Sequence, residues 1–204
     1  MNKNKWVYLS WLHYVCSITM AMMAVVVLSS CTQDKGAESA LVSVVTLDKE
    51  KTFSDIKEND SRFNCPVNEV MTGRGHKGDE NGKTTYFCKT AYLNPTKTLD
   101  LTATVWSAVI KESDGVEYTC PQNKVLISRR HGGDENGGTV YQCASIQGAE
   151  AGSVVVVENK TWSQEYTESD YTLKCGANQV MTGRYHKGDE NGKTKHQCAT
   201  LRTP

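Results

Sequence analysis

The chain has 204 residues with 23 basic and 23 acidic side chains, so its formal net charge is zero at neutral pH. This balance provides no basic surface of the kind that binds nucleic acid. It also excludes adhesion to an acidic membrane surface through charge alone.

Residues 1–30 have the organisation of an export signal. Lys3 and Lys5 give a positive start, and an apolar stretch follows from Tyr14 to Leu28. The small residues directly before Cys31 resemble a bacterial lipoprotein box, which predicts cleavage before Cys31 and acylation of that residue. An uncleaved membrane helix is the alternative, because the run from Trp6 to Leu28 is just long enough to span a bilayer. Both interpretations place the remainder of the chain outside the cytoplasm.

Cleavage would divide the chain into a signal peptide (1–30), a short polar tether (31–40) and one domain (41–204). It would remove two lysines and no acidic residue, leaving 21 basic residues against 23 acidic ones. We therefore expect an exported bacterial lipoprotein that is anchored at Cys31, in the periplasm or on the cell surface, and that contacts the membrane only through its lipid.

The six cysteines that follow are spaced with a fixed period. Within each pair the cysteines are 23 positions apart, and each pair follows the previous one by 55 positions, at Cys65 and Cys88, Cys120 and Cys143, and Cys175 and Cys198. An even set of cysteines in an exported protein indicates disulfides. Repeat symmetry favours a bridge within each copy, and closing a loop of this length contributes roughly 3 kcal/mol.

The segments between the paired cysteines are similar to one another, and the first and third are identical at 17 of 24 positions. The chain is therefore divided into three repeats of about 55 residues, at about 41–95, 96–150 and 151–204. Their upstream parts are rich in β-branched residues, at 41–47, 99–105 and 153–157, and predict strands. We expect an all-β domain of three or four strands per repeat, closed into a β-prism or a β-trefoil. A linear solenoid is less favoured, because its terminal repeats are usually atypical.

Two further structural expectations come from the same comparison. The aromatic residues Phe53, Trp106 and Trp162 occur at corresponding points and are expected to anchor the core. A strand is expected to end near Thr72, with the glycine-rich segment after it forming a loop. Asn81-Gly82 is the type of pair that adopts positive φ in a hairpin turn.

The motif Arg-x-His-x-Gly-Asp-Glu-Asn-Gly occurs once in each repeat, although the flanking sequences have diverged. Its polar residues and one nearby aromatic position form the candidate ligand-binding set. In repeat order these residues are Arg74, His76, Asp79, Glu80, Asn81 and Tyr86; Arg129, His131, Asp134, Glu135, Asn136 and Tyr141; and Arg184, His186, Asp189, Glu190 and Asn191.

Two explanations for the motif remain open. In the first, the loops are identical because folding requires them: glycine supplies unusual backbone angles, Asp and Asn bind their own backbone, and Arg74 pairs with Asp79 or Glu80 across the loop base. In the second, each loop binds a glycan. Carboxylates, amides and guanidinium groups would hold the sugar hydroxyls, and Tyr86 and Tyr141 would stack on the sugar. The third repeat has His196 at that position, so its site would differ.

Metal sites and catalysis have weaker support. Asp79-x-Asn81-Gly82 resembles the start of a calcium-binding loop, but the acidic residue at the twelfth position of such a loop is lacking. Calcium is therefore only an alternative, and no cofactor is expected. Three histidines meeting on an axis would give a zinc site as a further alternative. No nucleophile elbow, HExxH or phosphate loop occurs, and three equal copies do not suit one asymmetric active site, so we do not expect an enzyme.

The repeats resemble dermatopontin and the invertebrate lectins related to it. The shared pattern appears in the first repeat as Phe63, Cys65-Pro66, Asn68, Val70, Thr72-Gly73, His76, Glu80 and Tyr86 through Cys88. In the second it appears as Tyr118, Cys120-Pro121 and Tyr141. The family usually has an acid-Arg-x-aromatic cluster before the second cysteine, where this chain has Asp-Glu-Asn-Gly. In the third repeat Gly176 replaces the proline, and the aromatic is lost. The resemblance implies an extracellular adhesive protein without enzymatic activity.

We therefore expect a lectin-like lipoprotein whose partner is a glycan, such as a matrix or cell-surface polysaccharide. The alternative is a structural or protein-interaction lipoprotein in which the motif is the same in all repeats only because the turns require it.

Overall fold

The computed structural model describes residues 44–134 and 136–204. The predicted all-β class is confirmed, because this part of the chain consists of strands and their connections, without a helix. A helix long and apolar enough to span a bilayer is accordingly not found in it. The predicted signal peptide (1–30), tether (31–40) and lipid site Cys31 lie outside the described residues.

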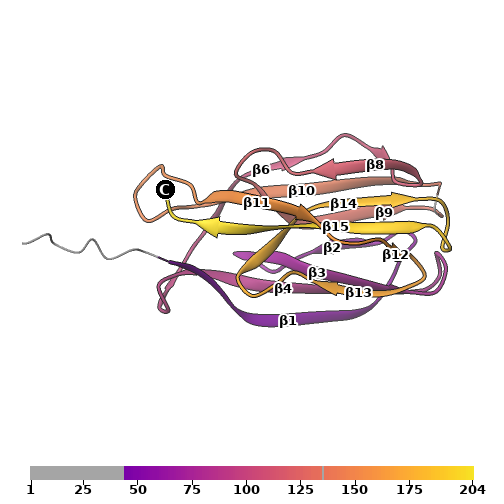
Figure 1. Cartoon of the computed structure of the whole chain (residues 1–204), viewed down its shortest axis with the longest axis horizontal. Coiled ribbons are helices and arrows are strands. Elements are labelled where there is room, and N and C mark those ends of the chain that lie inside the picture. Colours follow the sequence, from indigo (N-terminus) through magenta and orange to yellow (C-terminus); the bar gives the residue numbers. More distant parts are fainter. Residues whose placement is uncertain (1–43, 135) are drawn as a thin grey trace, which may run out of the picture. The chain divides into compact units, whose positions relative to one another are not determined.

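The described residues form fifteen strands, which make three sheets of five strands each (Figure 1). The first repeat contributes β1 (Val45–Lys57), β2 (Arg62–Asn64), β3 (Glu69–Lys77) and β4 (Lys83–Leu93). The second contributes β5 (Lys97–Thr98), β6 (Leu101–Trp106), β7 (Ile110–Lys111), β8 (Asp114–Thr119), β9 (Val125–Gly132) and β10 (Gly138–Ile146). The third contributes β11 (Val156–Trp162), β12 (Tyr166–Thr167), β13 (Asp170–Lys174), β14 (Gln179–Lys187) and β15 (Lys193–Arg202).

Each repeat gives one short strand to the sheet of another repeat. Sheet A has the order β1-β4-β3-β13, sheet B the order β2-β9-β10-β6, and sheet C the order β11-β15-β14-β8. The first repeat thus gives β2 to sheet B, the second gives β8 to sheet C, and the third gives β13 to sheet A. This exchange is cyclic, so no repeat completes its own sheet.

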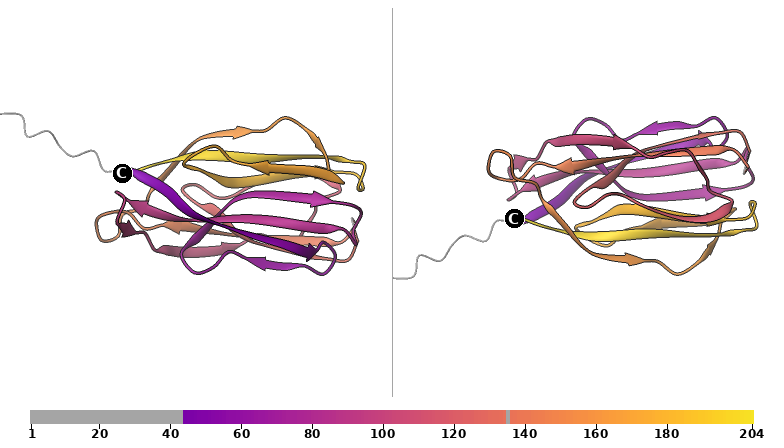
Figure 2. Two further views of the ribbon diagram at one scale, coloured as in Figure 1. Left: turned by 90° about the horizontal axis from the view of Figure 1, so that it is seen from below. Right: turned by 90° about the horizontal axis from the view of Figure 1, so that it is seen from above.

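The middle strands β3, β9 and β14 lie against one another, so the three sheets face a shared interior. An aliphatic cluster fills this interior at the end where β1 begins, and it contains Val45, Leu47, Val70, Ala91, Leu93, Leu99, Val125, Ile146, Val155, Val157, Val180 and Ala199. A second cluster contains Phe63, Met71, Tyr86, Cys88, Cys120, Leu126, Tyr141, Cys143 and Met181. The hairpins β3–β4, β9–β10 and β14–β15 turn at the opposite end, away from the C-terminus (Figures 1 and 2).

Disulfides join Cys65 to Cys88, Cys120 to Cys143 and Cys175 to Cys198, the within-repeat pairing expected from the sequence. Each bridge nevertheless connects two sheets, because the first cysteine of each pair follows an exchanged strand. The amide of Cys65, for example, donates to the carbonyl of Ile127 beside sheet B, whereas Cys88 lies in β4 of sheet A. The bridges therefore fasten the exchanged strands back to their own repeats.

Removal of one bridge should lower stability without changing the fold. We expect the double substitution Cys65→Ala and Cys88→Ala to lower the free energy of unfolding by about 3 kcal/mol, because the unfolded chain regains the conformational freedom of the opened loop. Urea unfolding followed by tryptophan fluorescence measures this difference. A loss below about 1 kcal/mol would show that the bridge adds little to the exchanged-strand contacts.

Three local expectations were wrong. The strand expected to end near Thr72 continues as β3 to Lys77, so the first half of the motif is strand and not loop. The positive φ of the turn occurs at Gly78 and not at Asn81-Gly82. The aromatic series does not anchor the core uniformly: Trp106 is 38% exposed on an outer sheet face, whereas Phe53 is partly buried against the second cluster.

Candidate functional site

The arginine and histidine of each motif lie on the inner face of a middle strand. Side chains two positions apart in a strand point to the same face, so Arg74 and His76 of β3 both point into the shared interior. Gly73 precedes Arg74, and Gly75 lies between Arg74 and His76; both glycines are on the outer face of the strand. The same alternation in β9 and β14 brings together three arginines and three histidines from the three repeats.

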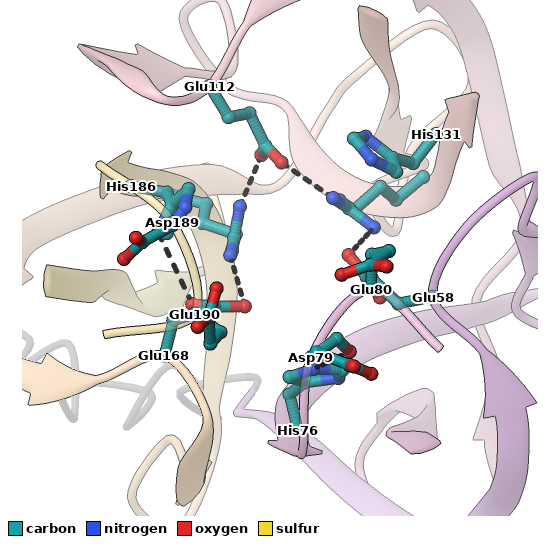
Figure 3. A pocket seen from close by; sticks show the side chains of 12 residues that line it. Glu58, His76, Asp79, Glu80, Glu112, His131, Glu168, His186, Asp189 and Glu190 are labelled. Carbon is teal, nitrogen blue, oxygen red and sulfur yellow. Dashed lines mark hydrogen bonds and ion pairs between the residues drawn. The ribbon is translucent and has the colours of Figure 1, made fainter. Parts of the chain in front are cut away.

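The three arginines form a closed ring with three buried glutamates, Glu58, Glu112 and Glu168. Figure 3 shows part of this ring, with the three glutamates labelled. Each arginine contacts the glutamate of its own repeat and that of the preceding one. The guanidinium–carboxylate distances are 2.8 Å for Arg74–Glu58, 2.9 Å for Arg74–Glu168, 2.6 Å for Arg129–Glu112, 2.7 Å for Arg129–Glu58, 2.7 Å for Arg184–Glu168 and 2.5 Å for Arg184–Glu112. The ring has no net charge, which allows six ionised groups to remain buried together.

The electrostatics of the ring keep its carboxylates ionised. Burial alone would raise the pKa of Glu168, but the charges of Arg184 and Arg74 outweigh burial and lower this pKa to about 2. The pKa of Glu58 is likewise held well below its usual range, because Arg129 and Arg74 overcome the effect of burial. The expected pairing of Arg74 with Asp79 or Glu80 is therefore wrong, since its partners come from a different part of the sequence.

Sequence reasoning missed the three glutamates, although a short signal for them exists. Each begins a Glu-x-Asp triplet shortly before an exchanged strand, at 58–60, 112–114 and 168–170. The triplets start 7, 8 and 7 positions before the first cysteine of their repeats, so the one-residue offset in the second repeat hides them from a comparison at a fixed period of 55.

Two of the motif histidines, His76 and His131, connect the ring to the turns, whereas His186 has Nδ1 3.5 Å from the ring carboxylate of Glu168. His76 has Nδ1 2.9 Å from the Thr84 hydroxyl, and Nε2 lies 3.0 Å from the carbonyl oxygen of Asp79. In the second repeat the corresponding distances from His131 are 2.7 Å to Thr139 and 2.9 Å to Asp134. Burial and the neighbouring arginine both lower the pKa of His76. At neutral pH the imidazole is therefore neutral, with Nε2 as the donor to the turn.

The polar side chains of the turn form hydrogen bonds within the turn itself. The Asp79 carboxylate accepts from the Asn81 amide at 2.9 Å, and the Asn81 side chain donates to Glu80 at 2.8 Å. The same Asp-to-amide bond occurs in the other two repeats, again at 2.9 Å. This arrangement is an Asx turn, which stabilises the local backbone.

Each turn is also bound to the Glu-x-Asp segments. The amide of Gly78 donates to the carbonyl of Ser169 in the third repeat, and the carbonyl of Glu80 accepts from the amide of Asn59 in its own repeat. The turns are thus fixed by the same segments that supply the ring glutamates, which makes ring and turns one connected unit.

Gly82 is required by close packing within the turn. A Cβ atom at this position would lie 2.2 Å from the Lys77 carbonyl oxygen, a contact that only a backbone shift could relieve. We expect Gly82→Ala to lower the free energy of unfolding by about 2 kcal/mol or more. Gly132→Ala is the control, because a Cβ there would meet nothing closer than 3.7 Å and should change stability by less than about 0.5 kcal/mol. Equal effects in a urea titration would contradict this account of the turn.

A cavity of about 40 Å³ lies between the ring and the turns, large enough for water but not for a sugar (Figure 3). Its lining includes the ring glutamates, the three motif histidines and the acidic residues Asp79, Glu80, Asp189 and Glu190. Within residues 44–134 and 136–204, no group of three or more histidines, cysteines or carboxylates is placed to hold a metal ion. The zinc alternative is wrong for this geometry, since His76 and His131 already use both ring nitrogens.

Tyr86 and Tyr141 cannot stack on a sugar, because they are 0% and 2% exposed. Tyr86 stacks on Phe63 at a centroid distance of 4.0 Å, and Tyr141 stacks on Tyr118 at 4.6 Å. The prediction that these tyrosines contact a ligand is therefore wrong, since both belong to the core.

The third repeat fills the same core position differently. Leu173 and His196 replace the stacked pair, and Tyr171 lies edge-on to His196 at a centroid distance of 5.3 Å. The Tyr171 hydroxyl is 3.2 Å from His196 Nε2 and also accepts from Arg74. Burial raises the pKa of Tyr171 to about 12, so its hydroxyl stays protonated.

The candidate residues are thus divided between interior and surface. The arginines and histidines are buried and, contrary to expectation, do not present their side chains on exposed loops: Arg74, Arg129 and Arg184, and His76, His131 and His186. The exposed candidates are Asp79, Asn81, Asp134, Asn136, Asp189 and Asn191, with Glu80 and Glu190 partly exposed. Glu135 lies outside the described residues.

Comparisons with protein-family models, curated proteins and solved structures found no match to this chain.

Proposed function

We propose that this chain is a membrane-tethered, extracytoplasmic binding protein that recognises a glycan at the end face formed by its three turns. The observation that carries the proposal is their placement. The three hairpin turns lie at the same end of the domain, opposite to the start of β1 at Val45 (Figures 1 and 2). A lipid at Cys31 would anchor the domain to the membrane through the residues that precede β1.

The end face offers repeated acceptors on a fixed frame. Asp79, Asp134 and Asp189 are exposed, and each carboxylate uses one described oxygen for its own turn. Carboxylate oxygens are suitable acceptors for sugar hydroxyls, and three weak equivalent contacts on one body gain affinity through multivalency. The buried ring below them keeps the turns in one arrangement, which reduces the entropy lost on binding.

The three disulfides agree with folding outside the cytoplasm. The proposed lipid anchor, and with it a location in the periplasm or on the cell surface, rests on the sequence before Cys31. The proposed relationship to dermatopontin-like proteins rests on the motif segments, and it favours the same non-enzymatic binding role.

We also propose that the sheets form a closed β-prism of pseudo-threefold symmetry. Cyclic exchange of β2, β8 and β13 supports this arrangement, as do the mutual contacts of β3, β9 and β14. In such a prism the ion-pair ring would lie on the symmetry axis.

A structural or protein-interaction lipoprotein is the second candidate, and one observation favours it. In the first repeat the described contacts give the motif residues folding roles: the arginine enters the ring, the histidine binds the turn, the aspartate caps it, and the glycines permit its backbone. Identity among the repeats could therefore reflect folding alone.

A charge-removing variant separates the two candidates. The triple substitution Asp79→Asn, Asp134→Asn and Asp189→Asn keeps an oxygen that can cap each turn but removes three carboxylates. On a glycan array, glycan binding predicts a signal from the unmodified protein that falls at least about tenfold in the variant, with an unchanged melting temperature. No bound glycan, together with a lower melting temperature for the corresponding alanine variant, would support the structural candidate.

A further inference from the structure

The outer face of sheet A contains a groove of about 290 Å³, separate from the end face. Two outward-facing rows of the sheet define it. Thr172, Gly75 and Thr85 lie side by side on β13, β3 and β4, and Asp170, Lys77 and Lys83 form the next outward row. Asp55 lies at the irregularity of β1 and closes the far side.

The floor of this groove is formed where the exchanged strand β13 packs closely on β3. Gly75 is buried, and a Cβ at this position would lie 2.7 Å from the Thr172 hydroxyl oxygen and 2.9 Å from the Tyr171 carbonyl oxygen. The Thr172 hydroxyl therefore covers Gly75, and the polar side chains around it are the groups that a ligand would meet.

The polar groups around the groove are not committed to other contacts. Within residues 44–134 and 136–204, the side chains of Asp55, Lys77, Lys83, Thr85, Asp170 and Thr172 make no hydrogen bond or ion pair with one another or with their neighbours. The turn aspartates, in contrast, each cap their own turn. The groove therefore has free donors and free acceptors around one concavity, as a binding site for a polar molecule requires.

The other two repeats use the corresponding positions differently. Arg130 replaces Gly75 in the second repeat, and its guanidinium lies 4.1 Å from the ring centroid of Trp106. In the third repeat the position of Thr85 is occupied by Lys195, which donates to Glu117 at 2.8 Å and lies 4.5 Å from the Tyr185 ring centroid. A groove of about 350 Å³ also exists on sheet B, and its lining includes Asp60 and Ser61 as well as arginines and a valine. There the Asp60 carboxylate already accepts from the Gly133 amide at 3.3 Å, whereas the sheet A groove has carboxylates without such a bond among the described contacts.

We propose that the sheet A groove is a binding site for one residue of a neutral, hydroxyl-rich ligand, that is, a sugar. Two carboxylates and two ammonium groups balance in charge, which disfavours a strongly charged ligand. Carboxylates accept from sugar hydroxyls, lysines donate to them, and the threonine hydroxyls do both. The volume is near the lower limit of small-molecule sites, as suits a single ring. This inference goes beyond the proposed end-face site and does not require the turns to bind.

Site-resolved titration tests the groove directly. Isotope-labelled mature protein is titrated with glucose, galactose, mannose and N-acetylglucosamine, and the backbone amide shifts are followed. We expect at least one sugar to shift the amides of Gly75, Thr85 and Thr172, with a Kd on the order of 1 mM. Thr85→Lys places at this position the residue that the third repeat already has, and it should weaken binding at least about tenfold. Val140→Lys, the matched substitution on sheet B, should leave the Kd unchanged.

The outcomes distinguish this site from the end face. Shifts confined to the turn amides would overturn the groove and leave the proposed end-face function standing. Equal effects of Thr85→Lys and Val140→Lys on the Kd would likewise overturn the groove as the binding site. Groove shifts that persist in the Asp79→Asn, Asp134→Asn, Asp189→Asn variant would establish an independent site. The absence of shifts anywhere up to about 50 mM sugar would contradict both proposals.

Discussion

Replacing Glu58 by glutamine is expected to lower the free energy of unfolding by about 3–5 kcal/mol. Glu58 is buried and bridges Arg74 of its own repeat and Arg129 of the second at 2.8 and 2.7 Å. Glutamine has nearly the same shape but no charge. The guanidinium groups of Arg74 and Arg129 would therefore each lose one of their two carboxylate partners while remaining buried. Urea unfolding with the disulfides intact measures the loss.

Glu158→Gln provides the matched control. Glu158 pairs with Arg202 at 3.1 Å on the surface, where both side chains are more than a third exposed. Solvent screens such a pair, so the same substitution should change stability by less than about 1 kcal/mol. Similar losses for the two variants would mean that the ring glutamates contribute no more than surface charges.

Acidification is the second change expected to have a large effect. The pKa of Glu168 is about 2 in the folded protein, against an ordinary value of 4.5, so folding favours its ionised form. This stabilisation is fully present above pH 4.5 and is lost as the pH falls from about 4.5 to 2, amounting to about 3 kcal/mol for this group alone. Glu58 and Glu112 have lowered pKa values for the same reason and add to the loss.

The histidines act in the same direction over a higher range. Burial and the neighbouring arginines lower the pKa values of His76, His131 and His186, so the unfolded chain binds protons more readily below about pH 6.5. Urea midpoints measured from pH 7 to pH 3 should therefore fall gradually at first and steeply below pH 4.5. A Glu168→Gln variant should show a shallower decline below pH 4.5. A constant midpoint between pH 4.5 and 3 would contradict the ionised ring.

The features that the sequence predicted correctly are those encoded at a fixed spacing. The constant interval between Cys65 and Cys88 and its two counterparts indicated within-repeat disulfides, and the β-branched runs indicated strands. These signals are local or periodic, so one chain is sufficient to recognise them. Which sheet accepts an exchanged strand is not local: β2 has only three residues and carries no mark of pairing with the second repeat.

The candidate site was predicted only in part. The motif residues do come together, but their arginines and histidines lie on interior strands, and their composition does not distinguish such a strand from a surface loop. Glycines beside Arg74 and His76 suggested a polar loop, but the glycines at 73 and 75 permit close approach of the exchanged strand β13. Arginine is seldom fully buried, and its burial depends on carboxylates from two repeats. Those carboxylates are recognisable only after the Glu-x-Asp triplets are aligned with a one-residue offset.

The most direct test of the ion-pair ring is a double-mutant cycle across two repeats. Glu58→Gln is combined with Arg129→Met and, separately, with Arg74→Met, and Glu58→Gln with Arg202→Met serves as the distant control. The ring predicts coupling energies of about 2 kcal/mol for both Arg129 and Arg74, and additivity within about 0.5 kcal/mol for Arg202. Additive losses for Glu58 and Arg129 would contradict the ring, since the two repeats would then not share this carboxylate.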